Sequence, residues 1–319
     1  MTRRVAAIDC GTNSVRLLVA EADGSGFAEL DRDLRLTRLG QGVDATGRFA
    51  PEALTRTLDA VADFAARIDH LGAERVRFVA TSAARDASNR EVFFAGVRAL
   101  LGVEAEIISG DEEARLSFAG ALSVARDVAW PVLVMDIGGG STELVLGAVD
   151  AAGAPVVRAA RSLDVGSVRL RERFLHSDPP TAAEVAAASR YVDELIAGSG
   201  VEVAAARTWI GVGGTATSLA AISLGLPTYD RARVDGAVLP RAAVRELADR
   251  LLGMPVAEVL RIPTMQPKRA DVICGGALIA ARVGDRCPVD LRVSEADILD
   301  GIVLDLLRPG GDAPGGPAL

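Results

Sequence analysis

Two short segments of the chain share a pattern of aspartate, glycine and hydroxyl side chains that could bind phosphate. Asp9–Leu17 aligns without gaps with Asp136–Leu144, and aspartate, glycine, serine and leucine recur at the same offsets after an apolar run. Glycine lets the backbone approach a ligand closely, and the N–H groups of such a turn can bind an anion. An aspartate two residues before a glycine is also typical of ordinary turns. Its repetition favours a pair of phosphate-binding loops.

Candidate ligands for phosphate and for a metal ion lie in both loops. The phosphate contacts are Gly11, Thr12, Asn13 and Ser14 in the first loop and Gly138, Gly139, Gly140, Ser141 and Thr142 in the second. Asp136 and Glu143 place a carboxylate at each end of the second loop, and Asp9 opens the first. Hard oxygen ligands of this kind suit Mg²⁺ bridging phosphate oxygens, with Mn²⁺ as the alternative. Glu143 is also compatible with a solvated position on a strand.

Three further segments could contribute to such a site. Gly214 and Thr215 follow a predicted strand and open a helix, where amides and the helix dipole favour an anion, although a purely structural turn fits equally well. Arg85 follows another strand and could bind phosphate with two parallel hydrogen bonds, or be a surface arginine. Glu113 lies at the start of a helix, where acids often only complement the dipole. In a catalytic role it would deprotonate a water in line with phosphorus.

Other chemistries find little support in the residues. No lysine follows the glycine loops, and Lys268 is the only lysine, which excludes a Walker loop. His176 beside Ser177 and Asp178 precedes two prolines in a polar loop, which does not favour a triad. Cys10 fits a small buried residue better than a nucleophile.

Composition places the chain among globular proteins of two domains. Its 319 residues exceed the size at which single cores usually divide. The net charge of −8 argues against nucleic acid or an anionic membrane as a partner. No signal peptide or membrane-spanning stretch is predicted. Three scattered cysteines fit reduced thiols, which predicts a cytoplasmic protein.

The hydrophobic pattern predicts α/β layering, because apolar β-type runs alternate with amphipathic helices. Helices are expected over Pro51–Leu71, after a cap at Asn89, from a capping box at Thr181 to Ile196, over Arg269–Val283 and over Ala296–Leu307. Strands are expected at Val5–Asp9, Val15–Ala20, Val76–Ala80, Val132–Asp136 and Thr208–Val212. The first loop therefore joins two strands, and the Gly214 loop follows another.

Seven segments in this order resemble the exopolyphosphatase / guanosine pentaphosphate phosphohydrolase (Ppx/GppA) family, within the actin, sugar kinase and heat-shock ATPase superfamily. They are Asp9–Leu17, Arg38–Gly42, Ala80–Asn89, Ile107–Arg115, Asp136–Leu144, Gly211–Thr215 and Arg269–Ile273. The resemblance implies two actin-like, ribonuclease H-like domains with a cleft between them. It assigns the catalytic base to Glu113, metal and water positioning to Asp136 and Glu143, and phosphate contacts to both loops and Arg85.

The implied activity is hydrolysis of a terminal phosphoryl group from polyphosphate. The expected domains are residues 1–126 and 127–308. The last helix belongs either to the second domain or packs back on the first, and residues 309–319 are expected to form a disordered tail. The chain stops near Leu319, without the C-terminal helical domains of long family members, so short polyphosphates are the expected substrate. A homodimer is implied by the family alone. Guanosine pentaphosphate is the alternative substrate, and a superfamily kinase or a noncatalytic phosphate sensor are alternatives of another class.

Overall fold

The computed structural model describes residues 3–24 and 26–308, so the expected disordered tail at 309–319 lies outside the described residues. The chain forms two compact units, of which the first combines the residues up to Ser123 with those from Asp297 onward. The second unit spans Val124–Ala296. Each unit is described by itself, and the interdomain cleft stays a prediction. None of the described helices is long and apolar enough to cross a bilayer.

The first unit contains a five-stranded mixed sheet in the order β3-β2-β1-β4-β5. Its strands are β1 (Arg4–Cys10), β2 (Val15–Asp23), β3 (Gly26–Arg35), β4 (Arg75–Ala80) and β5 (Ala105–Ile107). Its helices are α1 (Val43–Thr46), α2 (Pro51–Leu71), α3 (Ser82–Asp86), α4 (Arg90–Leu101), α5 (Gly110–Val124) and α13 (Ile298–Leu307). The central β1 pairs antiparallel with β2 and parallel with β4.

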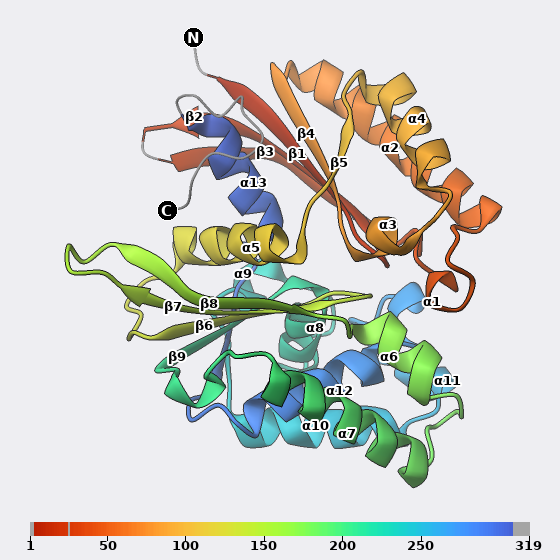
Figure 1. Cartoon of the computed structure of the whole chain (residues 1–319), viewed down its shortest axis with the longest axis vertical. Helices are drawn as coiled ribbons and strands as arrows, with labels where there is room; N and C mark the ends of the chain where they lie inside the picture. Colours follow the sequence, from red (N-terminus) through yellow and green to blue (C-terminus); the bar gives the residue numbers. More distant parts are fainter. Residues whose placement is uncertain (1–2, 25, 309–319) are drawn as a thin grey trace. The chain divides into compact units, whose positions relative to one another are not determined.

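Helices cover both faces of this sheet (Figure 1). Ala6 and Ile8 of β1 join a core with Phe64 of α2 and Phe93 of α4, whereas Val5 and its alternate neighbours pack with α13 and α5. Successive side chains of a strand point to opposite faces. Asp9, two residues beyond Ala7, therefore lies on the same face as α13.

The second unit contains a six-stranded mixed sheet in the order β10-β11-β9-β6-β7-β8. Its strands are β6 (Val132–Ile137), β7 (Thr142–Val149), β8 (Pro155–Leu163), β9 (Thr208–Val212), β10 (Val238–Leu239) and β11 (Leu291–Val293). Its helices are α6 (Ser167–Phe174), α7 (Ala182–Gly198), α8 (Gly213–Ser223), α9 (Arg231–Val234), α10 (Arg241–Gly253), α11 (Val256–Val259) and α12 (Ile273–Gly284), with 3-10 turns at Val203–Ala205 and Pro267–Arg269.

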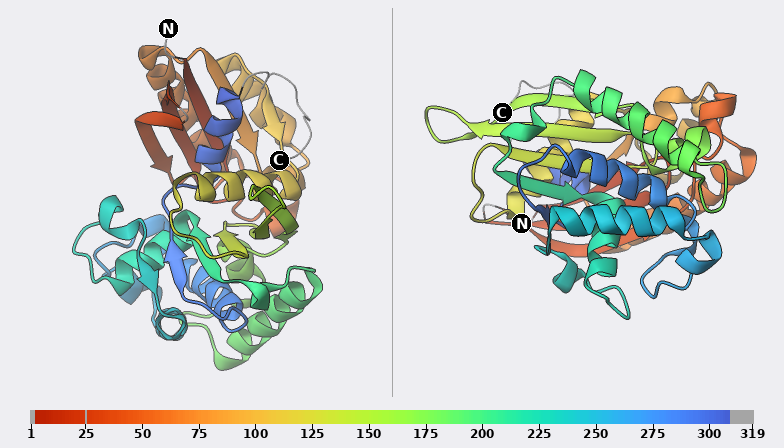
Figure 2. Two further views of the ribbon diagram at one scale, coloured as in Figure 1. Left: turned by 90° about the vertical axis from the view of Figure 1, so that its left-hand side faces the viewer. Right: turned by 90° about the horizontal axis from the view of Figure 1, so that it is seen from below.

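The second sheet repeats the first. Five of its strands follow the order β8-β7-β6-β9-β11, which matches β3-β2-β1-β4-β5, and β10 is an addition at the edge. Helices α7, α10 and α12 lie side by side over one face, as Figures 1 and 2 show. Leu133 and Met135 of β6 point into that core. Asp136 therefore points to the opposite face.

Most expected elements are confirmed. The helix over Pro51–Leu71 has the predicted bounds, with glycine ending it in the left-handed conformation at Gly72. The capping box at Thr181 is also present, since the side chains of Thr181 and Glu184 each accept from the other's backbone N–H. The α/β class is confirmed by the two mixed sheets with their helices.

Two expectations about helix starts need correction. The helix expected from Arg269 begins at Ile273, because Pro267–Arg269 forms a 3-10 turn first. Asn89 does stand at the N-cap of α4, but its side chain does not cap the helix. Instead its amide exchanges two hydrogen bonds with the backbone of Phe49, at 2.8 and 3.0 Å. Tertiary contact has displaced the local cap.

Candidate phosphate and metal site

The first loop is a tight turn between β1 and β2. The backbone N–H of Gly11 donates to the carbonyl oxygen of Ser14 at 2.9 Å and closes the turn. The carbonyls of Thr12 and Asn13 accept hydrogen bonds from Gly40 and Arg38, at 2.8 and 3.0 Å. Because these carbonyls are used inside the protein, the loop is held by the segment that follows β3.

Three side-chain oxygens of this loop are buried without a partner among the described residues. They are Oδ1 of Asp9, Oγ1 of Thr12 and Oδ1 of Asn13. An unsatisfied buried polar atom costs about 1–3 kcal/mol. A cluster of three in one loop is therefore a candidate ligand site, because a bound group would satisfy them.

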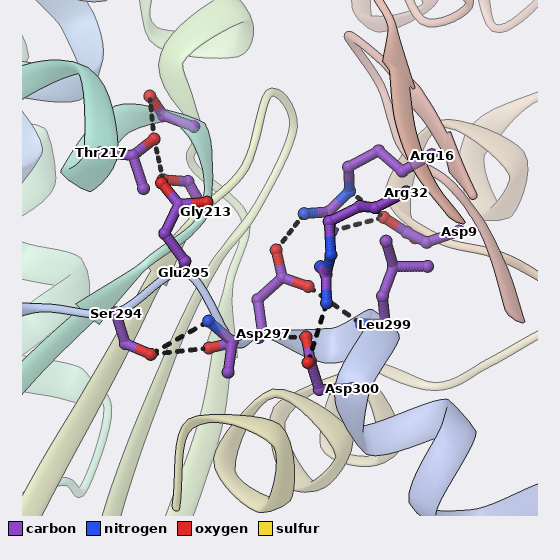
Figure 3. A network of polar contacts seen from close by, with 12 residues as sticks. Asp9, Arg16, Arg32, Gly213, Thr217, Ser294, Glu295, Asp297, Leu299 and Asp300 are labelled. Carbon is purple, nitrogen blue, oxygen red and sulfur yellow. Dashed lines mark hydrogen bonds and ion pairs between the residues drawn. The ribbon is translucent and has the colours of Figure 1, made fainter. Parts of the chain in front are cut away.

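Asp9 is held by an arginine from the neighbouring strand. Oδ2 of Asp9 accepts from Nε and Nη2 of Arg16, at 3.0 and 2.7 Å. Arg16 also donates to Asp297, which caps α13 and accepts from Leu299 N–H (Figure 3). Burial raises the pKa of Asp9, and the guanidinium of Arg16 offsets only part of that effect.

The same unit brings together two residues that the sequence analysis treated separately. Nη1 of Arg85, on α3, lies 2.9 Å from Oε2 of Glu113 in the first turn of α5, and it also donates to the carbonyl of Ile108. Only 8% of Glu113 is exposed. The pairing fixes the orientation of the Glu113 carboxylate, and a nearby guanidinium favours the ionised form that a general base requires.

The second loop has the same turn geometry as the first. The N–H of Gly138 donates to the carbonyl oxygen of Ser141 at 3.0 Å. The carbonyls of Gly138 and Gly139 accept from the first residues of α6, among them Ser167 N–H at 2.9 Å. A Cβ on Gly166 would lie 2.5 Å from the carbonyl carbon of Gly139, so glycine is needed for this close approach. The carbonyls of Gly138 and Gly139 are thus used by α6. The loop amides other than that of Gly138 are the groups that could bind an anion.

Asp136 and Glu143 are direct partners across the β6–β7 pair. Side chains of opposed residues project from the same face of a sheet. The two carboxyl groups are 8% and 2% exposed, and Oγ of Ser162 donates to Oε1 of Glu143 at 2.7 Å. The solvated position that the sequence left open for Glu143 is excluded by this burial.

The Gly213 turn at the end of β9 is built against Asp136. Gly213 has φ of +75°, and a Cβ there would lie 2.6 Å from Oδ1 of Asp136. The guanidinium of Arg269 packs closely against Gly214. A Cβ on Gly214 would lie only 2.5 Å from Nη2 of Arg269. Nη1 of Arg269 in turn donates to Oγ of Ser218 at 2.9 Å. This turn therefore joins a carboxylate and an arginine in the second unit.

We expect Gly213→Ala to lower the rate of phosphate release at least about tenfold, because the added methyl must displace the Asp136 carboxylate. Gly236→Ala is the matched control, since Gly236 has φ of +74° with nothing within 4 Å of the added Cβ. Both variants carry a similar backbone penalty of about 1 kcal/mol. Thermal unfolding and steady-state rates together separate the two effects, and equal activity in both variants would contradict the prediction.

The chain was compared with models of known protein families. The model of the Ppx/GppA phosphatase family matches residues 18–308. The chain belongs to the Ppx/GppA phosphatase family.

Three similar proteins match over nearly the full length of both chains. The chain is 49% identical to exopolyphosphatase 2 of Mycobacterium tuberculosis, over 95% of this chain and 98% of that protein. The crystal structure of the Aquifex aeolicus Ppx/GppA family member is 32% identical, with a TM-score of 0.80 over 96% of this chain and 98% of that one. An exopolyphosphatase from Cytophaga hutchinsonii is 25% identical, with a TM-score of 0.86 over 96% and 99%. The actin-like fold expected from the resemblance is confirmed.

Thr142 and Thr215, two of the expected phosphate contacts, have hydroxyl groups that hydrogen-bond to the backbone of other segments. Oγ1 of Thr142 donates to the carbonyl of Val165 at 2.6 Å, and the residue is fully buried. Oγ1 of Thr215 is buried and donates to the carbonyl of Ile137 at 3.3 Å. Their side chains are thus committed to backbone carbonyls, so contact with phosphate through these residues would use the backbone amides.

Two residues without a predicted role contact residues of the candidate site. Ser162 lies on β8 directly opposite Glu143, and only the strand register reveals that pairing. Arg269 lies far along the chain from Gly214, and no local spacing indicates their contact. Roles for the other expected residues stay predictions.

Proposed function

We propose that this protein is an exopolyphosphatase that removes terminal phosphoryl groups from inorganic polyphosphate. The observation that carries the proposal is the repeated anion-binding loop in a chain whose relative, 49% identical along its length, is named exopolyphosphatase 2. One loop offers amides and unpartnered hydroxyl and amide oxygens, and the other offers amides beside two carboxylates. Such loops suit a substrate made of consecutive phosphates.

The proposed reaction is attack of water on the terminal phosphorus. Glu113 accepts a proton from the water as the water oxygen bonds to phosphorus. The anhydride P–O bond breaks, orthophosphate forms, and the shortened chain leaves with the bond electrons. Arg85 holds the Glu113 carboxylate from one side, which fixes its orientation. Loop amides stabilise the charge on the phosphoryl oxygens.

Mg²⁺ is the proposed cofactor, and Asp136 and Glu143 would hold it. The two buried carboxylates project from one face of the sheet, and their hard oxygens match this cation. Within residues 3–24 and 26–308 no group of three His, Cys, Asp or Glu side chains forms a metal site. Mg²⁺ commonly uses only one or two carboxylates with water and phosphate oxygens, so the pair is sufficient. When bound, the ion would neutralise charge on phosphate oxygens.

We expect chelation by EDTA to abolish phosphate release and added Mg²⁺ to restore it. Glu143→Gln should raise the Mg²⁺ concentration for half-maximal rate at least about tenfold, because even outer-shell partners of metals are worth about 10–100-fold. Glu202→Gln, at an exposed acid of the same unit, is the control. An unchanged Mg²⁺ dependence in Glu143→Gln would remove Glu143 from the proposed ligands.

A substrate panel tests the function itself. Orthophosphate release is measured from polyphosphates of graded length and from guanosine pentaphosphate, without any acceptor. The proposal requires kcat/KM to be highest for polyphosphate, and the same panel tests the expected preference for short chains. A higher kcat/KM for guanosine pentaphosphate would favour the alternative function, hydrolysis of that nucleotide. Phosphate transfer only with an acceptor would indicate a kinase, and binding without release would indicate a sensor.

The homodimer and the cytoplasmic location belong to the same proposal. The dimer rests on the family resemblance, and the location rests on three free, buried cysteines. Light scattering of the purified protein measures its mass, and fractionation of cells measures its location.

A further inference from the structure

The two loops share their backbone geometry but differ in charge at one equivalent position. In both, a glycine N–H closes the turn onto a serine carbonyl, at 2.9 and 3.0 Å. In both, the aspartate that opens the loop is paired across antiparallel strands with the residue seven positions later. That residue is Glu143 in the second unit and Arg16 in the first. An acid and a base therefore occupy the same place relative to the loop aspartate.

Arg16 is a buried counter-ion of the first loop. Its side chain is 14% exposed, and it gives two hydrogen bonds to one oxygen of Asp9 and a third to Asp297. Asp9 and Asp297 are themselves 4% and 5% exposed. Buried carboxylates require a nearby positive charge or hydrogen-bond donors. The Arg16 guanidinium, which lies between Asp9 and Asp297 in Figure 3, supplies both. It does so from the position where the second unit has the Glu143 carboxylate.

We propose that Arg16 takes the place of a divalent cation in the first unit. The chain then binds one divalent cation, at Asp136 and Glu143, and the first loop receives phosphate beside an aspartate that is already neutralised. Arg16 is a positioning residue, because it acts on substrate through Asp9 and the loop. The inference rests on the proposed function, in which the first loop binds phosphate. The remaining buried oxygen, Oδ1 of Asp9, has no hydrogen-bond partner in the described part of the chain and would be available to a cation, so the number of bound cations tests the inference.

The experiment counts bound Mn²⁺ on the full chain by equilibrium dialysis and by the electron paramagnetic resonance signal of free Mn²⁺. Wild type should bind one Mn²⁺, and Asp9→Asn should also bind one. Glu143→Gln should bind it at least about tenfold more weakly. Arg16→Gln removes the guanidinium charge, so Asp9 should then take a second Mn²⁺. The double variant Asp9→Asn/Arg16→Gln should return to one.

Thermal unfolding gives a second readout. A ligand that binds only the folded state stabilises it in proportion to the logarithm of its concentration. Mn²⁺ should therefore raise the Tm of Arg16→Gln by more than it raises the Tm of wild type, and the double variant should lose this extra rise. Arg16→Lys keeps a positive charge and should behave as wild type in the Mn²⁺ count.

Two results would overturn the inference. One is a wild-type protein that binds two Mn²⁺ ions and loses one in Asp9→Asn, and the other is Arg16→Gln that gains none. If Arg16→Gln does not fold, the numbers of Mn²⁺ ions bound by wild type and by Asp9→Asn decide between the outcomes. One bound ion in each protein would support the inference. The proposed function fails separately, on the absence of phosphate release by wild type. An active enzyme with two Mn²⁺ ions would refute only the role of Arg16.

Discussion

Replacing Glu113 with glutamine should lower kcat for phosphate release from polyphosphate by about 10²–10⁴-fold, the usual contribution of a general base. Glutamine keeps the size of the side chain and an oxygen that can accept from Arg85. The 2.9 Å hydrogen bond can therefore persist, with a neutral acceptor in place of the carboxylate. It cannot take a proton from water. Because binding of the polyanion is left to the loops, KM should change much less than kcat.

Glu112→Gln is the matched control for Glu113→Gln. Glu112 is the preceding residue in the same first turn of α5, but its carboxylate is 39% exposed and pairs with Arg77 at 2.8 Å. The Arg77 side chain is 13% exposed and also pairs with Glu106 and Asp305, so it keeps two acidic partners when Glu112 is neutralised. This variant should therefore lose at most about 1 kcal/mol of stability and keep its rate. Comparable losses of kcat in the two variants, or none in Glu113→Gln, would mean that the assigned base is wrong.

The fold was largely predictable because the chain repeats itself. The shared pattern in Asp9–Leu17 and Asp136–Leu144 predicts two related cores, and the structure contains the same strand order twice. The outer strands were not predicted individually. Residues of β3 and β8 are mostly half-exposed, and charged residues interrupt their apolar runs, as in the segment Leu30–Arg35, so their apolar signal is weak. Their pairing follows from the turns and registers of the preceding strands.

The candidate site was predictable in its residue types but not in its pairings. Each loop could be recognised from consecutive residues, because a turn is local. The contact of Arg85 with Glu113 joins residues 28 apart, and that of Arg16 with Asp297 joins residues 281 apart. Only packing of the elements brings such groups together. A pattern read along the chain could not show that the first loop carries its own counter-ion.

Gly301→Ala should destabilise the first unit by about 3 kcal/mol, at the upper end of the cost of overpacking. A Cβ at Gly301 would overlap the backbone carbonyl of Leu116, and one at Gly120 would overlap the carbonyl of Asp297. These positions belong to α5 and α13, whose backbones touch because both residues are glycine. A backbone carbonyl in a helix cannot rotate away, so α13 must move. Tm should fall by about 6–12 °C.

Gly198→Ala shows what the same substitution does in a helix without that contact. Gly198 ends α7, is exposed and has nothing within 4 Å of an added Cβ. Alanine there should be neutral or stabilise by up to about 1 kcal/mol, because it is the better helix former. Equal Tm changes in Gly198→Ala and Gly301→Ala would contradict the proposed close packing.

The Gly120–Gly301 contact also reaches the first phosphate loop. Asp297 caps α13 and accepts from Arg16, which in turn holds Asp9. When α13 shifts to admit a methyl group at Gly301, Asp297 moves with it, and Arg16 loses an acidic partner. Gly301→Ala should therefore lower kcat/KM for polyphosphate even at temperatures well below its Tm. A folded variant with full activity would show that the loop does not depend on Asp297, whereas a loss of activity without a change in Mn²⁺ count would place the defect in the phosphate loop.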